Sequence, residues 1–239
     1  MKAFLFLGLL LAPAAAFSAD AEQSSIRIIF QWDLSLDSTG KITSLVPINE
    51  DYQAAVREQL EPVVKRWNFT PGKLDGQPAA TETTLRVWVS FDPTSDDSYR
   101  VRIVSADTGA TYKHVMPPEY PKSAMRMGRD GGVWLRVDYD AEGHVTAVIP
   151  IEGKDKPWVD GSLMRAAVAA VKHWTMRPEM VAGHGVAGAV IAPICFSLSD
   201  HTERCSWTPP GVNKPVDPAL PITLTSVVGL DMGAAGHSP

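Results

Sequence analysis

The chain has 239 residues and a formal net charge of -5 at pH 7, from 22 basic and 27 acidic residues. Hydrophobic residues make up 45% and charged residues 21%, which is close to an ordinary globular chain and excludes wholesale disorder, a collagen and a coiled coil. The mildly acidic balance gives no overall electrostatic attraction for nucleic acid, and two cysteines are too few for a cysteine-based zinc site.

Residues 1–21 have the layout of a secretory signal peptide. Lys2 gives a positive start, an apolar run of about 14 residues follows, and the segment ends in Ala19-Asp20-Ala21. The run is shorter than the roughly 20 residues of a spanning helix, which favours cleavage after Ala19 or Ala21 over an uncleaved membrane anchor. No cysteine lies nearby, which excludes a bacterial lipid anchor. We therefore expect an exported, soluble mature chain in the periplasm.

The segment from residue 26 to residue 91 is predicted to form two strands, a helix and a third strand. Residues 26–48 alternate like a β-hairpin around the turn Asp37-Ser38-Thr39-Gly40. Residues 50–67 switch to helical spacing, in which Pro62 is expected to kink or split the helix. Residues 85–91 alternate again as a strand.

The second half of the chain repeats this order. Residues 133–151 form the next predicted hairpin, Asp160 caps a helix that ends near Trp174, and residues 189–198 form the last strand. The turn glycines Gly40 and Gly143 are 103 positions apart, and the helix-end residues Trp67 and Trp174 are 107 apart. The sequence therefore predicts an α+β fold of two tandem ββαβ domains, each a small antiparallel sheet packed by a helix.

The two cysteines, Cys195 and Cys205, follow the last predicted strand. In an oxidising compartment they most simply form one disulfide, and a redox-active pair is the alternative. Residues 206–239 are rich in proline and glycine and are predicted to be a largely flexible tail. Residues 220–228 could form a short strand within that tail and return to cover the edge of the last strand.

The second half resembles the TonB C-terminal domain family over about residues 115–198. The resemblance rests on the opening Pro118-Glu119-Tyr120-Pro121, the Asp-x-x-Gly hairpin, the helix ending in Trp174-x-x-x-Pro178 and the strand ending in Phe196-x-Leu198. The first half is similar but lacks the Tyr-Pro opening. The resemblance implies helices packed on an antiparallel sheet. It also implies a periplasmic domain that pairs a third-strand edge with a short segment of an outer-membrane receptor.

The sequence pattern and the resemblance together predict five parts of the chain. These are a signal peptide at 1–21, an N-terminal TonB-like domain at 22–105, a linker at 106–116, a TonB C-terminal-like domain at 117–205 and the tail at 206–239. Full-length members of the family have a membrane anchor and a long proline-rich spacer. Here the anchor is predicted to be cleaved and no such spacer is present, which puts force transmission in doubt but leaves the binding module intact.

No arrangement of residues predicts an enzyme, a cofactor site or a metal site. The six histidines fall at unrelated positions, and no serine has the glycine-flanked setting of an exposed nucleophile. Asp138 and Asp140 share a strand face and could pair for acid/base chemistry. A turn role for Asp140 and solvent exposure for Asp138 explain them better.

Two groups of residues could contact a partner. Lys122, Arg126 and Arg129 could meet an acidic protein or a cell-wall carboxylate, or could form a solvated helix face. Trp88 and Trp134 point away from the apolar faces of their strands. They could anchor a partner, or be covered by a packed helix or the neighbouring domain.

The edge of the last strand is the predicted binding site. Residues 99–103 are strand-like and would fill the edge of residues 85–91 from within, whereas no comparable strand directly follows residues 189–198. An unpaired edge offers backbone donors and acceptors to which an extended peptide can add, although Pro193 lacks a donor. The predicted partner-binding residues are Val190, Ile191, Ala192, Ile194, Phe196 and Leu198.

The leading hypothesis is a non-enzymatic periplasmic module that serves TonB-dependent transport by binding an outer-membrane receptor or another envelope protein. The alternative is a structural or scaffolding envelope protein without a receptor partner. An open edge on the last strand would favour binding, and an edge filled by the tail would favour the scaffold.

Overall fold

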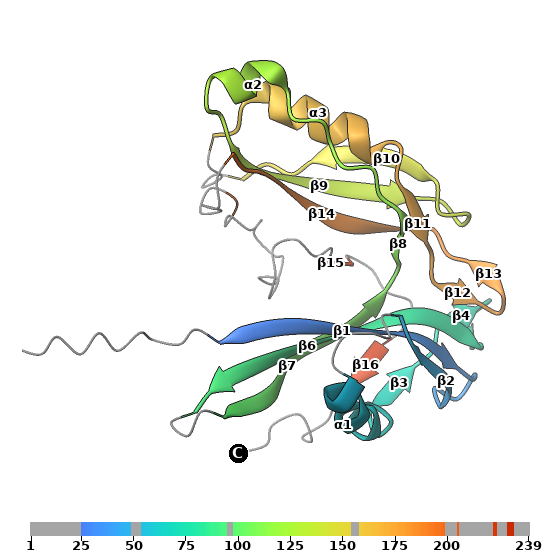
Figure 1. Cartoon of the computed structure of the whole chain (residues 1–239). Helices are drawn as coiled ribbons and strands as arrows, with labels where there is room; N and C mark the ends of the chain where they lie inside the picture. The colour runs from blue at the N-terminus through green and yellow to red at the C-terminus, as the bar shows by residue number, and fades with distance from the viewer. Residues whose placement is uncertain are drawn as a thin grey trace, which may run out of the picture.

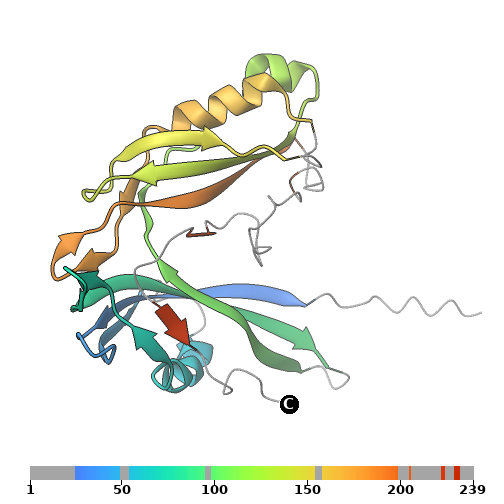
Figure 2. The same cartoon turned by 180° about the vertical axis from the view of Figure 1, so that it is seen from behind.

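The computed structural model describes residues 25–48, 54–94, 98–153, 158–198, 205, 222–223 and 229–231. It has the predicted mixed α+β character, with antiparallel sheets and few helices (Figure 1). The predicted signal peptide and most of the predicted tail lie outside the described residues. The two main sheets lie one above the other, and their helices cover the outer faces (Figures 1 and 2).

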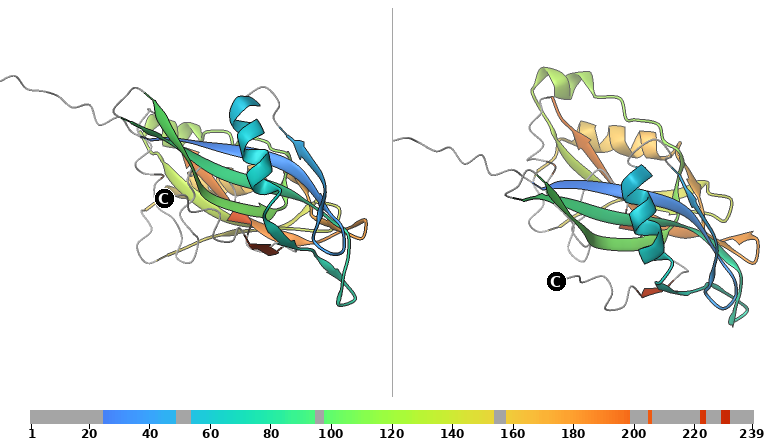
Figure 3. Two further views of the ribbon diagram at one scale, coloured as in Figure 1. Left: turned by 90° about the horizontal axis from the view of Figure 1, so that it is seen from below. Right: turned by 60° about the horizontal axis from the view of Figure 1, so that its bottom comes forward.

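The first sheet is built from the predicted hairpin and the third strand. Strands β1 (Ile26–Leu36) and β2 (Ile42–Pro47) form the hairpin, and β6 (Thr81–Pro93) pairs with β1 along its full length. Helix α1 (Ala54–Val64) lies across the outer face of this sheet (Figure 3). The expectation that Pro62 splits the helix is wrong, because Pro62 lies in the last turn and only two helical residues follow it.

The core of the first half fills the space between α1 and the sheet. Its strand residues alternate along β1 and β6, as the period of two requires. The buried members are Phe30, Trp32, Leu34, Leu36, Leu60, Val64, Trp67, Phe69, Leu85, Val87 and Val89.

Strand β7 (Tyr99–Gly109) fills the second edge of β6. It pairs with β6 from Thr84 to Pro93, which confirms that residues 99–103 close this edge from within. Strand β8 (Thr111–His114) follows after one residue. Residues 106–116, predicted to be a linker, therefore contain the end of β7 and the whole of β8.

The second sheet has the order β10-β9-β14-β15. Its hairpin consists of β9 (Gly131–Tyr139) and β10 (Val145–Pro150), and β14 (Gly188–Phe196) pairs with the full length of β9. Helices α2 (Lys122–Arg126) and α3 (Gly161–Val171) cover its outer face. Asp160 is the N-cap of α3, as predicted, since its carboxylate accepts a hydrogen bond of 2.8 Å from the Ser162 backbone N–H.

A separate core lies between α3 and the second sheet. It includes Leu163, Ala167 and Val171 from α3, Val133, Leu135, Val137 and Tyr139 from β9, and Val190, Ala192, Ile194 and Phe196 from β14. The two halves therefore bury their apolar side chains in two distinct clusters.

The hairpin turns of the two halves share one local geometry. Gly40 and Gly143 have φ values of 85° and 86°. A Cβ atom would lie 1.9 Å from the Phe69 carbonyl oxygen at Gly40 and 2.1 Å from the Met176 carbonyl oxygen at Gly143. Glycine is thus required at both turns by the backbone conformation and by the close approach of the chain after the helix.

Short strands that the sequence does not predict lie between each helix and the following long strand. In the first half they are β3 (Asn68–Thr70), β4 (Lys73–Leu74) and β5 (Gln77–Pro78), and in the second β11 (Thr175–Arg177), β12 (Met180–Val181) and β13 (His184–Gly185). The hairpin of β4 and β5 is exposed. Strand β11 pairs with β8, and β12 pairs with β6 at Thr81 and Glu82. The first sheet therefore contains strands from both halves of the chain.

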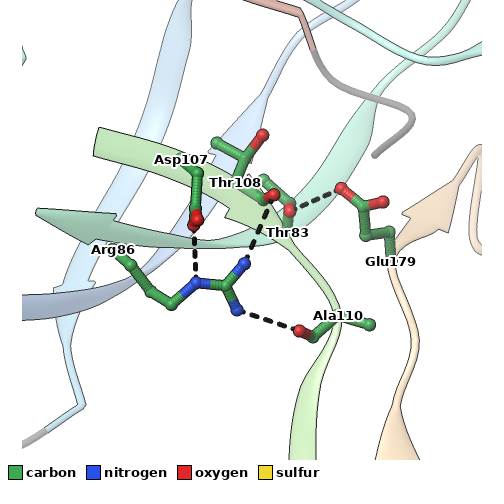
Figure 4. A network of polar contacts seen from close by, with 6 residues as sticks. All are labelled: Thr83, Arg86, Asp107, Thr108, Ala110 and Glu179. Carbon is green, nitrogen blue, oxygen red and sulfur yellow. Dashed lines mark hydrogen bonds and ion pairs between the residues drawn. The ribbon is translucent and has the colours of Figure 1, made fainter. Parts of the chain in front are cut away.

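Buried polar side chains reinforce this junction (Figure 4). Glu179, next to β12, is 2% exposed and accepts a hydrogen bond of 2.7 Å from the Thr83 hydroxyl group. Arg86 is 1% exposed and donates hydrogen bonds of 2.6 Å to the Asp107 carboxylate and 3.0 Å to the Ala110 carbonyl oxygen. Burial raises the pKa of Asp107, and the charge of Arg86 opposes that rise. The junction is therefore held by polar contacts as well as by strand pairing.

Two strands from the region after residue 205 pair with both halves. Strand β15 (Ile222–Thr223) pairs with β14, and β16 (Gly229–Asp231) pairs with β3. Part of the predicted tail is thus strand, and residues 222–223 lie within the run predicted to return to the β14 edge.

Candidate partner-binding edge

The outer edge of β14 is partly covered by the chain itself. Strand β9 occupies one side of β14 from Gly188 to Phe196. On the other side, β15 pairs at Val190 and Ile191. Within the residues that the structure describes, positions 192–196 have no strand partner on this side. The predicted edge exists, but it is not open along its full length.

The pairing of β9 with β10 shows which backbone groups of β14 face outward. The Trp134 carbonyl oxygen accepts a 2.8 Å hydrogen bond from the Ile151 N–H, on the side of β9 that faces β10. Since both backbone groups of a residue in an antiparallel strand point to the same side, Trp134 is not hydrogen-bonded to its β14 partner, Pro193. The backbone groups of Ile191, Pro193 and Cys195 therefore face the outer edge, where proline provides only an acceptor.

The predicted site residues offer backbone groups rather than side chains. The side chains of Val190, Ala192, Ile194 and Phe196 belong to the core beneath α3. Ile191 is on the opposite face and is 2% exposed, whereas Leu198, beyond the end of β14, is 45% exposed. A strand that adds to this edge would form backbone hydrogen bonds with β14 but would contact almost none of its side chains.

The predicted pairing of Cys195 with Cys205 is present as a disulfide in the structure. Cys195 is the last outward-facing residue of β14, so the bond fixes Cys205 next to the end of the edge. Within the described residues no cysteine is free.

The two tryptophans singled out by the sequence are buried. Trp88 is 4% exposed and Trp134 is 1% exposed, although both lie on the sheet faces that are turned away from the helices. The alternative that these tryptophans are covered is therefore correct, and neither is an exposed anchor for a partner.

The other candidate residues have local structural roles. Asp138 pairs with Arg136 at 2.7 Å, whereas the Asp140 carboxylate accepts the backbone N–H groups of Glu142 and His144 and closes the hairpin turn. Asp140, Glu142 and His144 lie close enough to share a metal ion, but this exposed acidic turn has no further feature of a metal site.

The basic cluster of the second half lies at α2, on the outer side of the second sheet. Arg129 stacks on the ring of Trp158, which is 71% exposed, with its guanidinium carbon 5.4 Å from the ring centroid. The segment that carries the cluster packs near the C-terminal end of β14, since Tyr120 contacts Phe196 with ring centroids 5.5 Å apart and donates a hydrogen bond of 2.6 Å to the Arg129 carbonyl oxygen.

None of the helices in the described part of the chain is long and apolar enough to cross a membrane. The only helices of ten or more residues there are α1 and α3, which have 11 residues each.

Comparison with known proteins locates the resemblance in the second half of the chain. Residues 116–198 match the family of the Gram-negative bacterial TonB protein C-terminal. Two proteins named TonB, from two strains of Xanthomonas campestris pv. campestris, are 36% identical over 96 residues, which cover 40% of this chain and 41% of each relative. A Pseudomonas aeruginosa protein named tonB2 is 37% identical over 95 residues, which cover 40% of this chain and 33% of that protein.

The matched part therefore spans less than half the length of these relatives. No solved structure matches the chain. The matched segment begins just before α2 and ends two residues after β14, so it contains the second sheet, its helices and the candidate edge. The resemblance predicted from the sequence is confirmed: residues 116–198 form a domain that is similar to the C-terminal domain family of TonB.

Proposed function

We propose that the chain is a non-enzymatic periplasmic module that binds an outer-membrane receptor in TonB-dependent transport. The bound receptor segment adds as a strand to the outer edge of β14. The single observation that carries this proposal is the position of β14, an edge strand of the TonB-like domain whose outer side pairs with only two described residues, Ile222 and Thr223. Cleavage of residues 1–21 and export to the periplasm belong to the same proposal.

The proposal includes two tandem ββαβ domains, at 22–105 and 117–205, of which the first supports the second. The shared hairpin-helix-strand order and the matching glycine turns favour a common origin of the two halves. In the first domain β7 occupies the edge that corresponds to the β14 edge. The second domain is therefore the one that binds the partner.

One observation favours the scaffold as a second candidate function. Strand β15 already pairs with β14 at Val190 and Ile191. If this pairing is permanent, the edge is a closed structural element. If it is displaceable, β15 competes with the receptor segment.

A proline on the outward edge tests the proposal. In Ile191→Pro, the outward N–H at position 191 is lost and the ring hinders the approach of a strand. Since each pairing hydrogen bond contributes roughly 0.5–1.5 kcal/mol, the loss of two or three bonds weakens binding to a purified outer-membrane receptor by at least about tenfold. Isothermal titration calorimetry measures the affinity, and circular dichroism checks the fold.

The matched control is Val148→Pro. Val148 lies on β10, the opposite edge of the same sheet, and its N–H faces outward because the Ile149 and Ile151 positions face β9. This variant keeps the wild-type affinity. A variant that removes β15 pairing, Ile222→Pro, binds the receptor more tightly if β15 is a competitor. Unchanged affinity in Ile191→Pro, with the fold intact, would rule out strand addition at this edge and favour the scaffold.

A further inference from the structure

Strand β15 is too short to hold its place on the β14 edge by its own hydrogen bonds. It consists of Ile222 and Thr223, which pair with Ile191 and Val190. Two residues form few backbone hydrogen bonds, and each contributes little because water competes for the same groups. Even a complete two-stranded hairpin is only marginally stable alone in water. The position of β15 therefore depends on what holds the chain on either side of it.

On the N-terminal side of β15, the disulfide holds the chain. It joins Cys205 to Cys195, with 5.6 Å between the two Cα atoms, and Cys205 is buried, at 7% exposure. Cys195 is an outward-facing residue of β14, about 13 Å along the strand from Ile191. The chain that leads to β15 thus starts from the same edge to which β15 returns.

On the C-terminal side of β15, strand β16 holds the chain. Its three residues pair with the whole of β3 in the first half (Figure 1). Strand β3 is itself firmly placed, because the side chain of Phe69 belongs to the core beneath α1. The chain from Thr223 to Gly229 spans at most about 22 Å when fully extended. The pairing of β16 with β3 therefore keeps β15 within a short reach of a fixed point.

The carbonyl group of Phe69 indicates which residues of β16 are hydrogen-bonded to β3. A Cβ atom at Gly40 would lie 1.9 Å from the Phe69 carbonyl oxygen and 3.0 Å from its carbonyl carbon, so this group points at the hairpin turn. The backbone groups of the two flanking residues of β3 therefore face β16. Their partners, Gly229 and Asp231, form the hydrogen-bonded pairs.

We propose that β15 is an autoinhibitory strand, which occupies the partner edge of β14 because the Cys195–Cys205 disulfide tethers it on one side and β16 on the other. This inference rests on the proposed strand addition at β14 and adds its regulation. The tethers make the pairing of β15 intramolecular, and flexible linkers give effective concentrations on the order of millimolar. A partner segment that extends along β14 to Cys195 forms more hydrogen bonds than β15 and displaces it. Loss of either tether opens the edge.

A peptide with the sequence of residues 219–228 probes the edge without a receptor. The peptide carries fluorescein, and fluorescence anisotropy measures its affinity for the chain and for two tether variants. In Cys195→Ser with Cys205→Ser the disulfide is absent. In Gly229→Pro with Asp231→Pro the two residues of β16 that pair with β3 lose their N–H donors. Circular dichroism checks that each variant is folded, and either variant alone is sufficient for the test.

We expect each tether variant to bind the peptide at least about tenfold more tightly than the wild type, because β15 then competes less effectively. Adding Ile191→Pro removes the outward donor of the edge and abolishes this gain. The matched proline on the opposite edge, Val148→Pro, leaves the gain intact. Amide exchange measured by NMR without peptide gives a second readout: the Ile191 amide exchanges faster in both tether variants, and the Val148 amide does not change.

The outcomes distinguish this inference from the proposed strand addition. If the wild type and the tether variants bind the peptide equally and Ile191→Pro abolishes binding, strand addition stands and β15 is not autoinhibitory. If Ile191→Pro leaves peptide binding unchanged, or if no variant binds the peptide, strand addition at this edge fails and this inference fails with it.

Discussion

Replacing Arg86 by methionine is expected to destabilise the chain by about 3 kcal/mol, because it leaves buried acceptors without their donor. The Arg86 side chain is 2% exposed and its guanidinium group donates to Asp107 and to the Ala110 carbonyl oxygen at the junction of the two halves. Urea denaturation followed by circular dichroism measures the loss. Arg102→Met is the control: it removes an arginine–aspartate pair on the exposed surface of the same sheet and costs less than about 1 kcal/mol.

The Arg86 variant also has a predictable pH dependence. Burial raises the pKa of Asp107, and the Arg86 charge limits that rise. Without Arg86 the pKa of Asp107 rises further, and a group whose folded-state pKa is raised loses stability as the pH increases. The deficit of the variant relative to wild type therefore widens as the pH rises above about 4, the ordinary pKa of an aspartate. A deficit independent of pH would show that Asp107 is not coupled to Arg86.

Replacing Val87 by proline is expected to cost about 3 kcal/mol or more, since Val87 lies in a strand that is paired on both sides. It is opposite Phe30 of β1 and Ala106 of β7, and its side chain is fully buried in the core beneath α1. Proline removes one hydrogen bond of a ladder, leaves a buried carbonyl without its donor and shrinks a core side chain. The midpoint of urea denaturation of the chain falls accordingly.

The comparison with Ile191→Pro distinguishes the roles of the two halves of the chain. Val87 and Ile191 each lie in the third long strand of their half of the chain. Strand β7 pairs along β6 at the edge near Val87, whereas only two residues of β15 pair with the edge of β14. We expect Val87→Pro to keep the receptor affinity that Ile191→Pro loses, when binding is measured under conditions in which the Val87→Pro variant is still folded. Equal loss of binding by the two folded variants would contradict the proposed assignment of the binding edge to the second half of the chain.

The long elements could be predicted from the sequence because their side chains follow one period for many residues. The residues of β1 alternate from Phe30 to Leu36, and the same turn and helix end recur in the second half, so the order of elements followed from pattern alone. The opening near Tyr120 and the helix end at Trp174 and Pro178 then pointed to the TonB C-terminal family, which the match over residues 116–198 confirms.

The contacts between the halves could not be predicted in this way. Strands β12 and β13 have two residues each, which is too short to show a period, and β12 pairs with a strand about 100 residues earlier. Arg86 occupies a polar position of an alternating strand, where the sequence suggests solvent exposure, but in the structure it is 1% exposed and bonded to Asp107 and Ala110. The exposure of the predicted site residues could not be predicted either. Whether a strand lies at the edge of a sheet depends on which strands pair with it, and the strand's own sequence pattern does not show this.

The most direct test of the central claim is amide hydrogen exchange of β14 during receptor binding. The chain, labelled with nitrogen-15, is studied by NMR with and without a peptide from the periplasmic side of the proposed outer-membrane receptor. Strand addition predicts slower exchange of the outward amides of Ile191 and Cys195, with no change at Val148 on the opposite edge. Binding with unchanged exchange at Ile191 and Cys195, or with new protection confined to α2, would contradict the account.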